Sequence, residues 1–184
     1  MKLRAGLRNR IDEFSCNYVN NWSRGGQFLE NNLINKIPII QKRGYMTTQE
    51  LWEVAYWKLE GGSKIVLDTP DSISKSVTKQ AFDTQDDWEK IVLLSQPQLK
   101  GIGASKASAV LHLYDTQDYP IIDKHALYSV GLKREFVCYE TLWREYVSFC
   151  RELTKELNVK MRKLDRALWR FSWEMEKNEQ SKAI

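Results

Sequence analysis

Apolar residues recur every three to four positions along most of this chain, and no stretch alternates between apolar and polar residues as a half-buried strand would. The pattern therefore predicts an all-α protein. We expect helices in six places: from Thr47 to the Gly61-Gly62 pair, near 72–82, from a cap at Asp83 or Thr84 to Pro97, over 104–114, directly after Asp123, and over about 155–176.

The start of the first of these helices has a specific signature. Thr47 and Glu50 have the spacing of a capping box, in which each side chain binds the backbone amide of the other residue. Residues 1–44 are more ambiguous, because they are polar and rich in asparagine. There we expect one or two helices, broken at Gly25-Gly26 and at Pro38, and the assignment of this segment remains poor.

Length and charge set broad limits on this protein. The chain has 184 residues, which fits a single compact unit over 1–184, and it carries 28 basic and 24 acidic residues. Basic residues gather near both ends, where they form either solvated helix faces or a phosphate-facing patch. The residues concerned are Lys2, Arg4, Arg8, Arg10, Lys155, Lys160, Arg162, Lys163, Arg166 and Arg170.

Cysteine usage bears on metals and on the cellular compartment. Cys16, Cys138 and Cys150 are odd in number and far apart, which is typical of free thiols in a reducing compartment. Three cysteines cannot hold an iron–sulfur cluster by four thiolates, and we expect no cofactor and no metal bound by side chains. No apolar run is long enough for a membrane span, so we expect no membrane partner. We also expect a monomer that is cytoplasmic or nucleoid-associated, or nuclear if the source is eukaryotic.

The segment Leu99–Gly103 is suited to a tight reversal between two helices. Gly101 and Gly103 flank one apolar residue, Ile102, which can enter the core while the glycines adopt turns that other residues avoid. The backbone N–H groups of the reversal and of the next helix start would then face outward together, an arrangement suited to a phosphate oxygen. Lys100 and Lys106 add positive charge beside it. The other interpretation is an ordinary helix–helix turn.

Asp123 follows the apolar approach Pro120-Ile121-Ile122 at an expected helix start. An aspartate at this position caps the helix well, and the helix dipole keeps its carboxylate ionised. An ionised carboxylate beside a sugar can also stabilise an oxocarbenium-like centre or orient a water molecule. Capping and chemistry are therefore compatible interpretations of Asp123.

Two motifs carry a resemblance to a known family. Leu99-Lys100-Gly101-Ile102-Gly103-Ala104-Ser105-Lys106-Ala107 and Ile121-Ile122-Asp123-Lys124-His125 resemble the helix–hairpin–helix (HhH-GPD) DNA glycosylase superfamily, in its iron–sulfur-free branch. The chain is similar there to small 8-oxoguanine glycosylases and to uncharacterised bacterial relatives. The resemblance covers about residues 45–171 and implies an all-α glycosylase fold with a helix–hairpin–helix over 86–114. It allows an arrangement of two helical lobes with a cleft between them.

The resemblance also implies roles for individual residues. Asp123 takes the place of the catalytic aspartate, and Gly101 and Gly103 take the place of the phosphate-binding glycines, where a monovalent cation is sometimes bound. Members that also cut the strand carry a lysine two residues after the last hairpin glycine, a position that Ser105 occupies here. Lys106 lies one residue further, about 100° around a helix, and is expected to contact phosphate.

The predicted function is therefore a DNA N-glycosylase of base excision repair. It would bind double-stranded DNA through Lys100, Gly101, Gly103, Ser105 and Lys106, extrude one nucleotide and cleave its glycosidic bond with Asp123. Trp57, Lys58 and His125 are candidates for the base pocket, each with an equally ordinary role in the core or at its rim. A DNA-binding module without chemistry and a glycosylase with lyase activity through Lys106 remain as alternatives.

Overall fold

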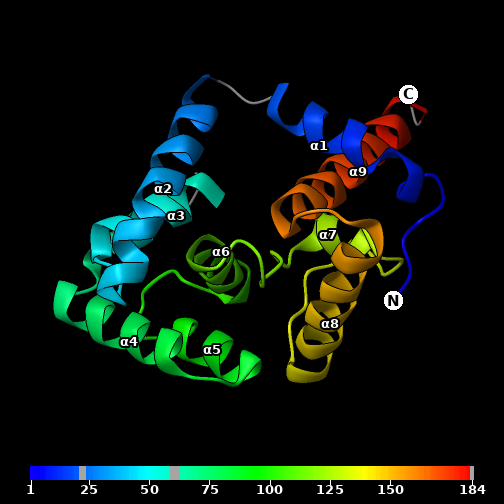
Figure 1. The fold of residues 1–184 in the computed structure, drawn as a ribbon. Helices are drawn as coiled ribbons and strands as arrows, with labels where there is room; N and C mark the ends of the chain where they lie inside the picture. The colour runs from blue at the N-terminus through cyan, green and yellow to red at the C-terminus, as the bar shows by residue number, and fades with distance from the viewer. Residues whose placement is uncertain (21–23, 59–62, 183–184) are drawn as a thin grey trace. The chain divides into compact units, whose positions relative to one another are not determined.

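The computed structural model describes residues 1–20, 24–58 and 63–182, and within these ranges it is helical with no strand (Figure 1). Two short 3₁₀ helices, η1 (Arg8–Arg10) and η2 (Lys64–Asp68), accompany the α-helices. The α-helices are α1 (Ile11–Asn20), α2 (Arg24–Arg43), α3 (Thr48–Lys58), α4 (Asp71–Asp83), α5 (Asp87–Leu94), α6 (Ala104–Tyr114), α7 (Lys124–Ser129), α8 (Glu140–Leu157) and α9 (Met161–Lys182). The expectation of an all-α protein is confirmed for the described residues.

The chain divides into two compact units. Unit 1 contains Met1–Trp22 together with Gln117–Ile184, and unit 2 contains Ser23–Thr116. The poorly assigned segment 1–44 is shared between them, since α1 belongs to unit 1 and α2 to unit 2. None of the helices among the described residues combines the length and the apolar character that crossing a bilayer requires.

Unit 2 is built around α3 and α6, which pack against each other and against α2. The predicted capping box at the start of α3 is confirmed: the Thr47 amide donates to Glu50 Oε2 at 2.8 Å, and the Glu50 amide donates to Thr47 Oγ1 at 3.3 Å. The α3 helix is described as far as Lys58. The Gly61-Gly62 pair that was expected to end it lies outside the described residues.

Two expectations about helix ends in unit 2 are wrong. Gly25-Gly26 and Pro38 do not break the chain into separate helices, because α2 runs from Arg24 to Arg43 through both. Pro38 removes one backbone donor, but it is exposed, so water can bind the carbonyl group left without a partner. The cap of α5 is Asp86 rather than Asp83 or Thr84, and its carboxylate accepts from the amides of Trp88 and Glu89.

Buried hydroxyl groups connect the hairpin, residues Leu99–Gly103, to the rest of unit 2. The hydroxyl of Thr48 donates to the Thr69 carbonyl at 3.0 Å and lies 2.7 Å from the hydroxyl of Ser74. Thr69 in turn accepts, through Oγ1, a hydrogen bond from the Lys100 amide at 3.0 Å. Because buried polar groups are costly unless paired, these bonds fix the segment before α4 and the hairpin relative to each other.

Unit 1 is organised around α9, which packs against α1, α7 and α8 (Figure 1). The chain's first residues bind the end of α7, where the amides of Lys2 and Arg4 donate to the carbonyls of Val130 and Ser129 at 3.1 and 3.0 Å. The N-terminal segment thus completes the packing of a unit otherwise made from the C-terminal half of the chain.

The final helix does not begin near residue 155 as expected. Two helices occupy this region: α8 ends at Leu157 and α9 begins at Met161. Asn158 separates them in the left-handed conformation, at φ 51° and ψ 47°, and the amide of Val159 returns to the Thr154 carbonyl at 3.0 Å. Asparagine tolerates this conformation better than most residues, so it ends a helix without a glycine or a proline.

Candidate nucleic-acid interface

The hairpin, residues Leu99–Gly103, joins α5 to α6 in unit 2. Leu99 and Ile102 are buried, whereas Gly101 and Gly103 are exposed. The two apolar side chains therefore hold the turn on the core of unit 2. Gly101 has a φ of 73°, in the left-handed region that favours glycine. The amide of Ile102 donates to the Leu99 carbonyl at 3.2 Å and closes the turn. The expected tight reversal with a buried Ile102 is present.

The start of α6 lies directly after the hairpin and has no side-chain cap. Gly103 is the N-cap residue, with a φ of −93°, and Ala104 and Ser105 behind it are half-buried. The first amides of an α-helix lack partners within the helix, so the exposed start of α6 can offer donors to an anion. The amide of Lys100 cannot contribute, because Thr69 accepts its hydrogen bond. The Lys100 side chain itself is exposed.

Lys106 folds back over the hairpin. Its ammonium group donates to the Gly101 carbonyl at 2.9 Å, and partial burial lowers the pKa of Lys106 from its usual value. Lys106 thus adds positive charge beside the exposed glycines. A monovalent cation bound at this carbonyl would meet the ammonium group, so the residues present do not fit such an ion there.

In unit 1, Asp123 is the N-cap residue of α7. Its Oδ1 accepts hydrogen bonds from the amides of His125 and Ala126, both at 2.9 Å, and the side chain is half-buried. The backbone of Asp123 is extended, with φ −157° and ψ 178°. The expected cap is therefore present, and it orients the carboxylate through one of its two oxygens.

His125 lies under this cap and is buried against α9. Its Nδ1 lies 3.1 Å from the hydroxyl of Ser172 and 3.9 Å from a carboxylate oxygen of Glu176. The imidazole ring meets the Trp169 ring edge to face at 5.3 Å. Trp169 stacks on Trp173 at 6.1 Å. A histidine of α7 and a tryptophan of α9 are thus in contact directly after Asp123.

Many of the clustered cations are paired with carboxylates. On α9, Arg162 contacts Asp165 at 2.6 Å and Arg170 contacts Glu174 at 2.6 Å. Further pairs join Lys163 to Asp12 and Arg8 to Glu156. Paired charges attract phosphate less than free ones do, so these contacts favour the interpretation as solvated helix faces for the residues concerned.

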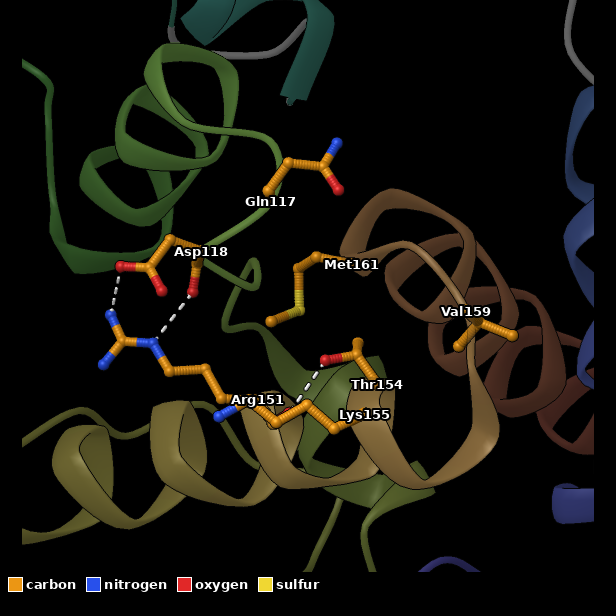
Figure 2. Close-up of a pocket in the computed structure, with 7 residues that line it drawn as sticks. All are labelled: Gln117, Asp118, Arg151, Thr154, Lys155, Val159 and Met161. Atoms are coloured by element: carbon orange, nitrogen blue, oxygen red, sulfur yellow. Dashed lines mark hydrogen bonds and ion pairs between the residues drawn. The ribbon is translucent and has the colours of Figure 1, made fainter.

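A hollow of about 250 Å³ lies in unit 1, between the segment at Gln117 and Asp118 and the last turn of α8 (Figure 2). Arg151 spans one side of it, donating to the Asp118 carboxylate at 2.6 Å and to the Asp118 carbonyl at 3.2 Å. Its other lining residues are Thr154, Lys155, Val159 and Met161. Asp123 does not line this hollow, so the hollow is not the base pocket expected beside that carboxylate.

The predicted site residues fall into two sets. Unit 2 holds Lys100, Gly101, Gly103, Ser105 and Lys106 together, whereas Asp123 and His125 belong to unit 1. Trp57 and Lys58 also belong to unit 2, where Trp57 is buried and Lys58 half-buried. Their role in a base pocket beside Asp123 stays a prediction.

No family model matches the chain, and neither a curated protein nor a solved structure matches it.

Proposed function

We propose that this protein is a DNA N-glycosylase with a helix–hairpin–helix fold, which removes a damaged or mispaired base. The observation that carries the proposal is the Asp123 carboxylate, held by two backbone amides at a half-buried helix start. A carboxylate fixed in this way can act on a sugar only if the protein also binds nucleic acid. The hairpin with its exposed glycines, the uncapped start of α6 and Lys106 support that second requirement.

The reaction follows from these groups. The hairpin binds a backbone phosphate without sequence preference, and one nucleotide leaves the stack. The bond between C1′ and the base nitrogen breaks, and its electron pair leaves with the base. Asp123 stabilises the positive charge that develops on the deoxyribose. A water molecule then adds at C1′ and gives a proton to Asp123, and this proton returns to the released base. Ser105 at the position of the family's lysine favours simple hydrolysis.

The second candidate is a glycosylase that also cuts the strand through Lys106. The lowered pKa of Lys106 supports it, because a neutral amine is the form that attacks C1′ to form a Schiff base. Borohydride trapping on DNA with an abasic site tests this directly. Covalent trapping of the wild type that is lost in Lys106→Gln would establish the lyase, and the absence of trapping would exclude it.

A panel of duplexes tests the main proposal. Each duplex carries one lesion, such as 8-oxoguanine, uracil, an alkylated purine or a mismatch, and base release is measured under single-turnover conditions. We expect release from at least one duplex and none from undamaged DNA. Binding to every duplex without release would instead establish the DNA-binding module, in which Asp123 acts only as a helix cap.

A further inference from the structure

Ile121 lies two residues before Asp123, and buried side chains bind both of its backbone groups. Its amide donates to Oδ1 of Asp165 on α9 at 3.2 Å, and its carbonyl accepts from the hydroxyl of Tyr146 on α8 at 3.0 Å. These two contacts come from helices that are distant in sequence. They fix the segment that leads into α7, whereas the capping bonds fix Asp123 only relative to α7 itself.

Asp165 is oriented for this contact by a second bond. Its Oδ2 contacts the guanidinium of Arg162 at 2.6 Å, so each carboxylate oxygen has its own partner. Both side chains are largely buried, and a buried carboxylate is strongly unfavourable unless it is paired and hydrogen-bonded. Arg162 in turn lies over the ring of Tyr18 on α1, 5.5 Å from its centre. Asp165 therefore has little freedom to release the Ile121 amide.

Tyr146 holds the other side of Ile121. It is fully buried, and this burial, together with the nearby Cys150 and the carboxylates of Asp165 and Asp123, raises the pKa of Tyr146 well above its usual value. The hydroxyl stays protonated and remains a donor to the Ile121 carbonyl. Tyr146 also lies near enough to Asp123 to be influenced by its charge, so the held segment and the carboxylate form one cluster.

We propose that Asp165 is a positioning residue that acts through the Ile121 amide to hold the Asp123 carboxylate in place. This inference rests on the proposed glycosylase function. A displacement of about 1 Å in a reacting group can lower a rate on the order of 100-fold, so loss of this contact is expected to lower base release by 10- to 100-fold.

Three variants separate the acceptor from the charge. Asp165→Asn keeps an oxygen that can accept from the Ile121 amide, and Asp165→Ala removes it. The pair Arg162→Met with Asp165→Leu removes both buried charges together, which protein cores often tolerate, and so keeps the test decisive if Asp165→Ala does not fold. Glu174→Ala is the matched control, because it removes the carboxylate of another arginine pair on the same helix.

The readouts are the single-turnover rate of base release, DNA affinity, hydrogen exchange at the Ile121 amide, and NMR titration of the Asp123 carboxyl group.

The expected result is a 10- to 100-fold slower release in Asp165→Ala and in the double variant, with unchanged DNA affinity. Asp165→Asn should keep most of the rate, and Glu174→Ala should match the wild type. Wild-type rates in the variants that lack the acceptor would overturn the inference, as would an equal loss in Asp165→Asn. If the wild type releases no base from any duplex, the proposed function fails, and the exchange and titration measurements decide the positioning by themselves. Faster Ile121 exchange with a shifted Asp123 titration would support it, and unchanged values would overturn it.

Discussion

The hydroxyl of Thr69 accepts a hydrogen bond from the backbone amide of Lys100 at 3.0 Å, across 31 positions of sequence. Thr69 is buried, and its own carbonyl accepts from the hydroxyl of Thr48. This hydrogen bond therefore joins the turn that exposes Gly101 to the segment between η2 and α4. The hairpin depends on residues outside its own sequence, and this dependence can be tested separately from DNA binding.

Replacing Thr69 with valine keeps the shape of the side chain and removes the acceptor. We expect a loss of about 1 kcal/mol in the free energy of unfolding, the usual net contribution of one hydrogen bond, because this bond is partly buried. Chemical denaturation measures the loss, and hydrogen exchange locates it at the Lys100 amide. Thr69→Ser is the control, since it keeps the hydroxyl. Equal exchange at Lys100 in both variants would contradict this role of Thr69.

Gly101 and Gly103 form a matched pair for alanine substitution. Gly101→Ala places a side chain at a φ of 73° and should cost about 1–2 kcal/mol of stability. At Gly103 the φ is −93°, and an added Cβ meets no protein atom within 4 Å, so the only expected loss of stability is the smaller one from alanine being a poorer N-cap residue. If a phosphate approaches the start of α6, Gly103→Ala should nevertheless weaken binding to any duplex in fluorescence anisotropy. Unchanged affinity in a stable Gly103→Ala protein would place the phosphate elsewhere.

Periodicity and helix-start signals predicted most elements correctly where the information is local. The Thr47–Glu50 box, the buried Ile102 between two glycines and the Asp123 cap are each specified by residues within a few positions. The break at Asn158 was missed because the apolar spacing continues across it. The continuity of α2 through Pro38 was missed because buried Leu33 and Ile40, on either side of the proline, hold the helix in place by packing.

Long-range contacts account for what the sequence could not predict at the candidate site. Nothing near Thr69 indicates that it binds the hairpin, and nothing near Asp165 indicates that it binds Ile121, 44 positions away. Both contacts depend on which helices meet in three dimensions. The same holds for Tyr146, whose hydroxyl reaches the Ile121 carbonyl because α8 packs against α9 in unit 1. Spacing along the chain can suggest the reacting group but not the residues that hold it.

Lys106→Gln tests the electrostatic role of the lysine beside the hairpin. If its ammonium contacts phosphate, the variant should bind every duplex more weakly, and the slope of log affinity against log salt should fall by about 1. Base release from bound DNA should persist. Lys79→Gln is the charge-matched control, because Lys79 is an exposed lysine of the same unit and is paired with Asp83. An equal effect of the two substitutions would show that only net charge matters.

Cys138 provides a pH-dependent test of the packing after α7. Burial raises the pKa of the Cys138 thiol to about 11, whereas Cys16 on α1 is exposed. Since the thiolate is the reactive form, alkylation of Cys138 by iodoacetamide should be slow at pH 8 and should rise about tenfold per pH unit until the pKa is reached. Mass spectrometry of partly labelled protein measures this, with Cys16 labelled first. Equal labelling of both cysteines at pH 8 would contradict the partial burial of Cys138.

Asp123→Asn separates capping from chemistry at the proposed catalytic carboxylate. Asparagine caps helices about as well as aspartate does, so the thermal midpoint and DNA affinity should change little. Base release should fall on the order of 10²–10⁴-fold, because the neutral amide can neither stabilise positive charge on the sugar nor accept a proton from water. Asp123→Ala is the companion variant, since it removes the cap as well and should cost about 1 kcal/mol of stability in addition. Wild-type release by Asp123→Asn would remove Asp123 from the reaction and leave it the role of the residue that caps α7.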